Sequence, residues 1–271
     1  MRIATWNINS VRARADRAVA WLERTGTDVL ALQETKCSDA QFPHAVFEAA
    51  GYEVAHVGLN QWNGVALVSR VGLEDVEVGF PGQPTFGADT PVVEARAIGA
   101  TCAGVRVWSL YVPHGRAVAD PHYAYKLDWL ARLREAAAGW VDPATGDPSA
   151  QVALVGDWNV IPLDTDVWDV TAFEGHTHVT PAEREAFFSF ADVGYTEVSR
   201  VHVPDEGKYT YWDYQQLAFP KNRGLRIDFA YTSPALTSRV TQVSIDREER
   251  KGKGASDHVP VVLDLAGTVA S

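Results

Sequence analysis

Polar side chains capable of chemistry interrupt or end apolar runs at six points along the chain. These points are Asn7, Glu34, Asp157, Asn159, Asp228 and the pair Asp257–His258. A polar group near an apolar interior costs several kcal/mol unless it finds a protein partner, water or a metal ion. Taken singly, each is most simply a helix cap, a turn residue or a satisfied buried pair. Six together favour a shared site, because strand ends gather at one edge of a layered α/β fold.

The residue types at these points favour a hard divalent cation. Carboxylate and amide oxygens without clustered cysteine or histidine suit Mg²⁺, with Mn²⁺ as a substitute, rather than zinc. A metal ion beside arginine-rich segments withdraws charge from phosphoryl oxygens, while a carboxylate takes a proton from water. His258 next to Asp257 adds a donor for the charge that develops on phosphorus. The pattern therefore predicts phosphate-ester hydrolysis.

Short apolar strands alternating with helices are expected to carry these residues. Strands are predicted over 2–8, 28–33, 52–57, 65–69, 92–98, 105–112, 152–155, 226–232, 240–245 and 259–265. Helices are predicted after the capping boxes Ser38–Gln41 and Thr180–Glu183, and over the apolar stripe from Tyr125 to Ala137. Residues 142–149 have a linker-like composition but an ordinary loop length, so a surface loop is expected there. Nothing else breaks the pattern, which predicts one domain over residues 1–271.

Composition excludes several classes of protein. The chain has 271 residues, of which 46% are hydrophobic and 22% charged, so it is neither disordered nor collagen-like. No apolar run is long enough for a membrane span, and the chain opens on a strand pattern rather than a signal peptide. Two cysteines, Cys37 and Cys102, cannot make a disulfide framework. The expectation is a monomeric cytoplasmic protein with no membrane partner.

The charge is unevenly distributed. The net charge of −11 argues against a protein that coats nucleic acid by bulk attraction. Residues 219–256, however, hold eight basic and four acidic side chains, and residues 1–24 hold five arginines against two acidic residues. Both stretches could be ordinary solvated faces. They also lie beside the polar points described above, where they could contact phosphates.

Seven short motifs occur in the order found in a known family. They are Trp6-Asn-Ile-Asn-Ser-Val-Arg12, Leu32-Gln-Glu-Thr-Lys36, Leu110-Tyr-Val-Pro113, Gly156-Asp-Trp-Asn159, Tyr211-Trp-Asp-Tyr214, Asn222-Arg-Gly-Leu-Arg-Ile-Asp228 and Ser256-Asp-His258. Each motif alone is weakly specific, but seven in order from residue 3 to about 263 are strong. The chain resembles the exonuclease III family of abasic-site endonucleases, within the endonuclease/exonuclease/phosphatase superfamily. The resemblance implies an α/β (α+β) four-layer sandwich, in which two mostly antiparallel β-sheets are flanked by helices.

The same resemblance implies roles for individual residues. Metal-associated positions are Asn7, Glu34, Asp157, Asn159 and Asp257, and catalytic positions are Tyr111, Asp157, Asn159, Asp228 and His258. Asp157 matches the aspartate that activates water, and Asn159 the amide that orients it. His258 matches the histidine bonded to the scissile phosphate, and Asp228 the aspartate that pairs with this histidine. Tyr111 matches a tyrosine whose hydroxyl approaches the phosphate.

Substrate contacts are predicted partly from charge and partly from aromatic residues. Phosphate contacts are expected from Arg12, Asn222 and Arg223, which position a duplex without reading its sequence. Tyr211 and Trp212 could line a pocket for a flipped, baseless sugar, although packing beneath a loop is comparably plausible for Trp212. These residues complete the predicted substrate-binding set together with His114.

Three features depart from the family pattern or suggest additional chemistry. His114 follows Tyr-Val-Pro where many members have asparagine or glutamine, and its imidazole can still donate to a phosphate. Gln215 replaces a common arginine. His176 and His178 suggest a second metal site, but without nearby cysteine or carboxylates they are interpreted as loop residues.

The resulting hypothesis is a Mg²⁺-dependent DNA repair nuclease. It would cleave duplex DNA 5′ to abasic sites and act as a 3′–5′ exonuclease. One alternative is another phosphodiesterase of the same fold, acting on inositol phosphates, sphingomyelin or RNA. A second is a DNA-binding module without catalysis, which predicts the loss of at least one of the catalytic side chains; none is lost.

Overall fold

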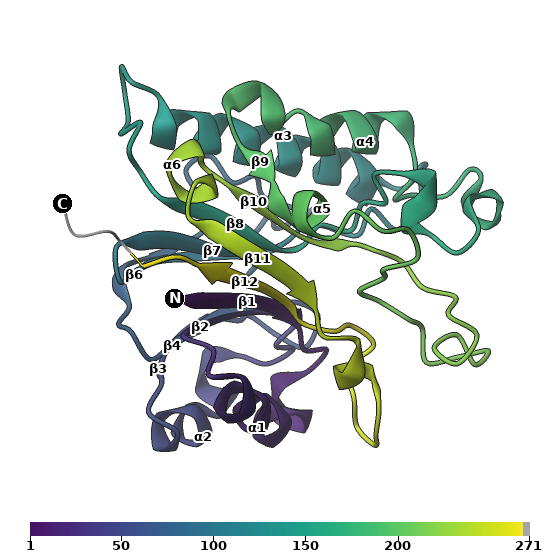
Figure 1. The fold of residues 1–271 in the computed structure, drawn as a ribbon. Coiled ribbons are helices and arrows are strands. Elements are labelled where there is room, and N and C mark those ends of the chain that lie inside the picture. Colours follow the sequence, from purple (N-terminus) through teal and green to yellow (C-terminus); the bar gives the residue numbers. More distant parts are fainter. Residues whose placement is uncertain (268–271) are drawn as a thin grey trace.

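The computed structural model describes residues 1–267, which form two six-stranded sheets packed between two layers of helices (Figure 1). In spatial order, the first sheet contains β11 (Val240–Ile245), β12 (Val261–Leu265), β1 (Arg2–Asn7), β2 (Val29–Gln33), β4 (Val65–Ser69) and β3 (Glu53–Val57). The second contains β5 (Glu74–Val78), β6 (Ala97–Cys102), β7 (Val105–Tyr111), β8 (Val152–Asp157), β10 (Asp228–Thr232) and β9 (Thr196–Glu197). This arrangement confirms the predicted four-layer sandwich.

Each sheet has one parallel pair of strands, and that pair lies at its centre. β1 runs parallel to β2, and β7 runs parallel to β8, whereas every other neighbouring pair is antiparallel. The last paired residues are Asn7 with Gln33 in one sheet and Tyr111 with Asp157 in the other. Because parallel strands end at the same edge, the residues at and just beyond these positions emerge side by side.

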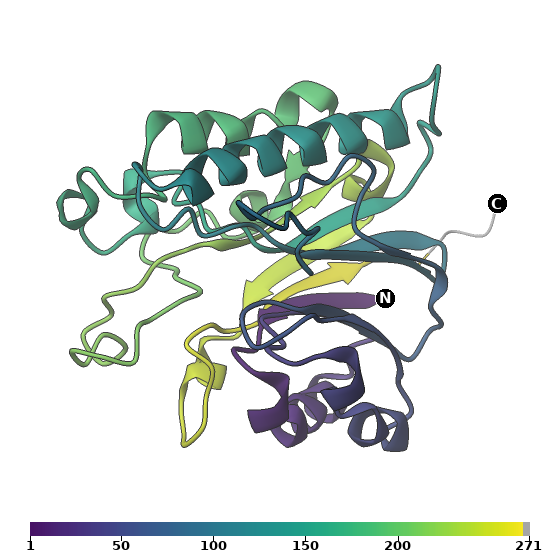
Figure 2. The ribbon, with the colours of Figure 1, turned by 180° about the vertical axis from the view of Figure 1, so that it is seen from behind.

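Helices cover the outer face of each sheet. α1 (Ala15–Thr25) and α2 (His44–Ala49) lie on the first sheet, and α3 (Pro121–Val141) and α4 (Pro181–Phe188) lie on the second, as both views show (Figures 1 and 2). The short helices α5 (Val198–His202) and α6 (Pro234–Thr237) pack beside β10. Most of the predicted apolar stripe of α3 is buried in a cluster with residues of β7 and β8, which fixes this long helix to the sheet; the exception is Leu127, which is half-buried outside the cluster.

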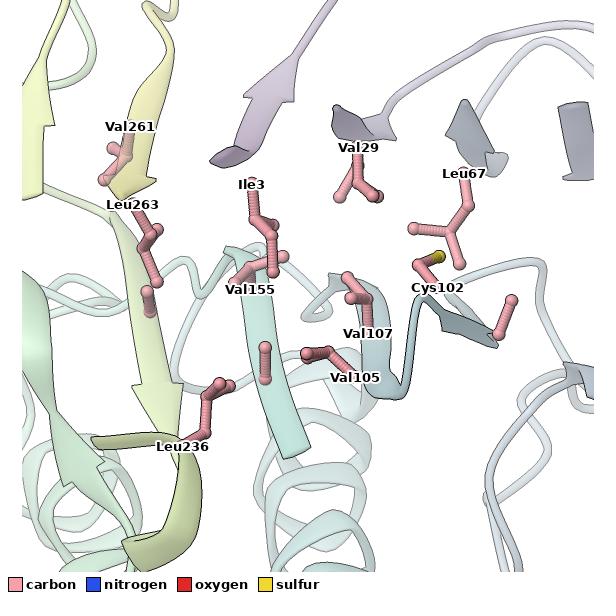
Figure 3. Packing of buried hydrophobic residues seen from close by; sticks show 14 of the residues in the cluster. Ile3, Val29, Leu67, Cys102, Val105, Val107, Val155, Leu236, Val261 and Leu263 are labelled. Atoms are coloured by element: carbon pink, nitrogen blue, oxygen red, sulfur yellow. The ribbon is translucent and has the colours of Figure 1, made fainter. Parts of the chain in front are cut away.

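The main core fills the space between the two sheets. Ile3 and Val29 of the first sheet point toward Val107 and Val155 of the second, and all four are fully buried (Figure 3). Burial of one such side chain stabilises the fold by about 1.5–3 kcal/mol, so the facing rows form a rigid frame. That frame holds the ends of β1, β2, β7 and β8 in place relative to one another.

Most of the predicted elements are confirmed. The strands expected over 65–69 and 240–245 have those bounds, and seven others differ by a few residues at one or both ends. The capping box of Thr180 and Glu183 opens α4, with Pro181 at its first position. Residues 142–149 lie in the loop between α3 and β8, as expected.

The prediction of a strand over 92–98 was wrong for most of its length. Val92 and Val93 are exposed, and Val92 makes only an isolated bridge with Phe86, whereas β6 begins at Ala97. Strand β5 was not predicted because its five residues are all exposed and three are acidic. The capping box at Ser38 opens a single 3-10 turn (Asp39–Gln41), and α2 begins beyond Pro43.

Within residues 1–267, no helix combines the length and apolarity that crossing a bilayer would need.

Candidate active site

The polar residues at the strand ends converge on one cleft at the edge where the parallel pairs end. The cleft has a volume of about 440 Å³ and is lined by side chains from both sheets, among them Glu34, Tyr111, Asp157, Asn159, Asp257 and His258. Glu34 follows β2, Tyr111 ends β7 and Asp157 ends β8. Donor atoms of Glu34, Asp157 and His258 lie within 4.8 Å of one another. Residues far apart in the chain thus form one acidic cluster.

Asn7 joins the two carboxylates at the centre of the cluster. Its Nδ2 donates to Glu34 Oε1 (2.8 Å) and to Asp157 Oδ2 (2.9 Å), and its side chain is fully buried. The other oxygen of Glu34 accepts from Lys36 Nζ at 2.7 Å. Lys36 also donates to Asn9 Oδ1 (2.6 Å), and Asn9 Nδ2 donates to Asp257 Oδ1 (3.0 Å). Asp257 is therefore tied to the cluster through Asn9 and Lys36.

The two carboxylates have opposite electrostatic settings. Burial disfavours the ionised form of Glu34, but Lys36 and Asn7 outweigh burial, and its pKa is lowered. For Asp157, burial is the largest effect, and with Asp228 and Glu34 nearby it raises the pKa to about 7 despite the attraction of His258. One carboxylate thus stays ionised while the other exchanges a proton near neutral pH.

His258 forms a buried pair with Asp228. His258 Nδ1 lies 2.8 Å from Asp228 Oδ2, and its Nε2 lies 3.8 Å from Asp157 Oδ2. Burial alone would lower the pKa of His258, but Asp228, Asp157 and Asp257 raise it to about 10. The imidazole is therefore charged at neutral pH, with Nε2 facing the cleft.

Asn159 and Tyr111 occupy fixed positions beside Asp157. Asn159 has a left-handed backbone (φ 50°), its N–H donates to Asp157 Oδ1 (3.0 Å) and its Nδ2 donates to Val112 O (2.9 Å). Tyr111 is almost fully buried, and burial together with the charge of Glu34 raises its pKa well above the ordinary value. Its hydroxyl therefore stays protonated and can act as a donor.

The donor set suits a hard cation. Glu34 and Asp157 present carboxylate oxygens into the cleft, which is the chemistry that Mg²⁺ and Mn²⁺ prefer. A ring nitrogen of His258 lies within 4.8 Å of the carboxylate oxygens of Glu34 and Asp157. The imidazole is protonated and bonded to Asp228, however, so it fits a phosphate better than a metal ion. Asn7 turns its amide N–H groups, not its oxygen, toward the carboxylates, so it supports their position.

The predicted substrate-binding residues are only partly brought together. His114, Tyr211 and Arg223 line the cleft, and the Tyr211 ring lies 4.9 Å from the His258 ring. Arg12 and Asn222 are exposed outside its lining. The structure does not place Trp212 in the cleft: the side chain is buried against Tyr209 and Phe219, and supports the loop above it.

Several residues of the cleft were not predicted from the sequence. Trp168 and Phe173 form an aromatic wall, and the Arg223 guanidinium lies over the Trp168 ring at 4.8 Å. His178, interpreted as a loop residue, does lie in a loop but is buried, and its ring packs edge-on against His114 at 4.5 Å. Among the sequence signals, only the Trp168 position in an otherwise polar segment could have indicated this wall.

Comparisons with known proteins give a consistent result. Residues 4–258 match the model of the Endonuclease/Exonuclease/phosphatase family. Exodeoxyribonuclease III of Haemophilus influenzae is 30% identical over 276 residues, covering 96% of this chain and 98% of that protein. An AP endonuclease from Archaeoglobus fulgidus has a similar structure, with a TM-score of 0.89, 33% identity and coverage of 98% of this chain and 100% of that chain. The 3′ phosphatase NExo from Neisseria, bound to a product DNA hairpin, gives a TM-score of 0.90, 34% identity and the same coverage.

Proposed function

The chain belongs to the endonuclease/exonuclease/phosphatase family, and on this premise we propose that it is a Mg²⁺-dependent nuclease of DNA repair. It hydrolyses phosphodiesters 5′ to abasic sites and removes nucleotides from 3′ ends, in line with the exodeoxyribonuclease III and AP endonuclease relatives. The observation that carries this proposal is the pair Glu34–Asp157, joined by Asn7, with a charged His258 opposite.

Asp157 is suited to activate water. Asn7 Nδ2 and the N–H of Asn159 hold its carboxylate in the cleft, and a base placed in this way contributes about 10²–10⁴ in rate. The water oxygen attacks phosphorus in line, its proton passes to Asp157, and the bond from phosphorus to the 3′ oxygen breaks. The leaving 3′ oxygen takes a proton from solvent, so that the products are a 5′-phosphate on the abasic side and a 3′-hydroxyl on the other side of the nick. The N–H of Asn159 is bonded to Asp157 and its Nδ2 to Val112, so its side chain is fixed beside the proton acceptor. From this position Asn159 would orient the water.

Charge that develops on the phosphoryl oxygens is met by donors that need no rearrangement. His258 presents Nε2 to the cleft and is kept charged and oriented by Asp228. Tyr111 adds a protonated hydroxyl at the end of β7. A divalent cation held by Glu34 and Asp157, with Asn7 and Asp257 as supporting residues, would neutralise charge on the phosphate.

We propose that the enzyme is a monomer and that its partner is duplex DNA. Arg223 lines the cleft, and Arg12 and Asn222 are exposed outside its lining; these three would contact phosphates, while Tyr211 and His114 would contact the reacting nucleotide. Contact limited to these local cations is compatible with the net charge of −11, because phosphate attraction acts within about 10 Å at moderate salt.

The test uses a labelled duplex with one abasic analogue and a second duplex with a recessed 3′ end. We expect Mg²⁺-dependent nicking on the 5′ side of the analogue, shortening of the 3′ end, and no reaction with chelator. Cleavage of inositol phosphates or sphingomyelin, without cleavage of either duplex, would contradict the proposal.

The Asp157→Asn variant tests the proton acceptor. We expect its turnover to fall by at least about 10³-fold, with binding of the duplex largely retained, because the amide keeps the shape but accepts no proton. Fluorescence anisotropy in the presence of Ca²⁺ measures binding, and gel-resolved cleavage measures turnover. A variant with normal turnover would show that another group takes the proton.

A further inference from the structure

Lys126 is a fully buried cation directly behind the cleft. It lies near the start of α3, and its side chain has no exposed surface. Its ammonium has three N–H groups, and three oxygens surround it: Glu183 Oε1 at 2.5 Å, Asn159 O at 2.6 Å and His114 O at 3.4 Å. Each N–H of the Lys126 ammonium therefore has an acceptor within the protein, and none is left to bind a substrate.

Glu183 is buried and satisfied to the same degree. Its Oε1 also accepts from Thr177 Oγ1 (2.5 Å), and its Oε2 accepts from the N–H and the hydroxyl of Thr180. The ammonium and the carboxylate thus connect three segments that border the cleft: 112–115 after β7, 158–161 after β8, and 176–180 before α4. They form a single polar junction, here called the Lys126 junction, within an otherwise apolar layer.

Stability does not explain why this position carries a charge. Desolvation of a buried ion pair commonly equals or exceeds its Coulombic gain, and apolar replacements of similar volume are often as stable or more so. An apolar residue at 126 would, however, leave the Asn159 carbonyl without a partner. The observation to be explained is therefore the contact with Asn159, not the ion pair itself.

The Asn159 turn has a left-handed backbone (φ 50°), which asparagine adopts more readily than most residues other than glycine. Its position in the cleft therefore depends on the partners that hold its polar groups. The N–H and Nδ2 of Asn159 are held by Asp157 and Val112, and the carbonyl is held by Lys126. Lys126 is the one contact of the three that comes from outside the two strand ends.

The junction also fixes one wall of the cleft. The carbonyl of His114 accepts from Lys126 and from Thr177 Oγ1 (3.2 Å), and the His114 ring packs on His178. The carbonyl of His178 accepts from the N–H of Ile161 (2.8 Å), which links that ring to the segment after β8. Movement at the ammonium would therefore shift Asn159 and this wall together.

We propose that Lys126 is a positioning residue for the hydrolysis: its buried ammonium, with Glu183 as counter-ion, holds the Asn159 turn and the His114–His178 wall in place without touching the substrate. This inference rests on the proposed function for its kinetic consequence, and on geometry alone for its structural one. A misplacement of about 1 Å at a reacting group can lower the rate about 10²-fold, so the junction would act on kcat rather than on DNA binding.

The decisive variant is Lys126→Met combined with Glu183→Gln, which removes both charges and keeps the capping box of α4. We expect a thermal midpoint within about 5 °C of the wild type, because no unpaired charge remains. We expect kcat to fall about ten- to hundredfold while KM for the duplex changes by less than about twofold. Amide exchange of Asn159 should accelerate about tenfold, while exchange within β8 stays unchanged.

The matched control is Arg132→Met, which removes a cation from the exposed face of the same helix. The proposal is overturned if the double variant matches this control in kcat and in Asn159 exchange, or if kcat falls without faster exchange. Should the double variant fail to fold, Lys126→Leu with Glu183→Gln, which likewise leaves no unpaired charge, is measured in the same way, with the same two outcomes. Absence of cleavage by the wild type would contradict the proposed function, but the exchange measurement would still decide whether Lys126 holds the turn.

Discussion

Two lysine–glutamate pairs flank the same strand ends, and they differ almost entirely in their access to water. Lys36 and Glu34 meet at 2.7 Å at the mouth of the cleft, with side chains 30% and 17% exposed. Lys126 and Glu183 meet at 2.5 Å behind it, with no exposure at all. The same two residue types thus serve a site in two settings, one of which solvent or a metal ion can reach.

The contrast shows how burial decides what an ion pair does. A partly exposed pair contributes about 0–1 kcal/mol, so Lys36 can leave Glu34 when a cation arrives. A buried pair cannot open without leaving a charge in the interior, so the Lys126 junction is effectively permanent. Glu34 is therefore suited to exchange partners during function, and Glu183 to keep one partner throughout.

Glu34→Gln should show the largest effect, and it should fall on activity. The amide still accepts from Asn7 but no longer offers a charged ligand, so we expect kcat/KM to fall about 10³-fold, which equals about 4 kcal/mol. The free energy of unfolding should change by less than about 1 kcal/mol, because Lys36 can turn to solvent. Steady-state cleavage and urea unfolding measure the two quantities. A loss of stability larger than that of the Glu183 variant would break the comparison.

Glu183→Gln should have the reverse profile, with a loss of stability of about 3 kcal/mol at neutral pH. This carboxyl is buried, which would raise its pKa, but Lys126 and Thr177 outweigh burial and the pKa is lowered. A lowered pKa stabilises the fold fully above the ordinary value of 4.5, and this stabilisation is lost as pH falls through the lowered value. The difference in the free energy of unfolding between the wild type and the variant should therefore become smaller in acid. Urea unfolding across that pH range checks it, and a gap that widens in acid would refute it.

Lys36→Met should show the smallest effect of the three variants. Unlike the other two substitutions, it should improve a property of the enzyme, namely its affinity for the metal ion. Without the ammonium at Glu34 Oε2, an arriving cation has no competitor, so the half-saturating Mg²⁺ concentration should fall about three- to fivefold. Stability should change by less than about 1 kcal/mol. Cleavage rates over a Mg²⁺ titration provide the readout. An unchanged or higher requirement for Mg²⁺ would show that Lys36 and the cation do not compete.

The sequence predicted the elements better than it predicted their partners. Apolar runs such as 65–69 and 240–245 were located because a fully or half-buried strand leaves a composition signal. The run from Val92 misled because valine is common in strands, yet here it lies on an exposed loop. β5 left no such signal, because an exposed edge strand needs no apolar face.

Trp212 and Lys126 show the same limit at the level of single residues. Trp212 stands beside Tyr211 in the chain, but only Tyr211 faces the cleft, because successive residues of an extended segment point to opposite sides. Lys126 stands within the apolar stripe from which helix α3 was predicted, and no local pattern marks its side chain as buried. Its partner Glu183 lies 57 residues further along the chain.

By itself, the sequence determined most of the buried strands, the helices α3 and α4, and which polar residues stand at strand ends. It also carried the ordered motifs that indicated the family. The tertiary structure alone decided which of these residues contact one another, as Asn7 and Asp157 do across 150 residues of chain. It also decided that one of two similar lysine–glutamate pairs is partly exposed to solvent and the other fully buried. The reason is that local patterning depends on neighbours in the chain, whereas charge, pKa and metal affinity depend on distance and burial in space.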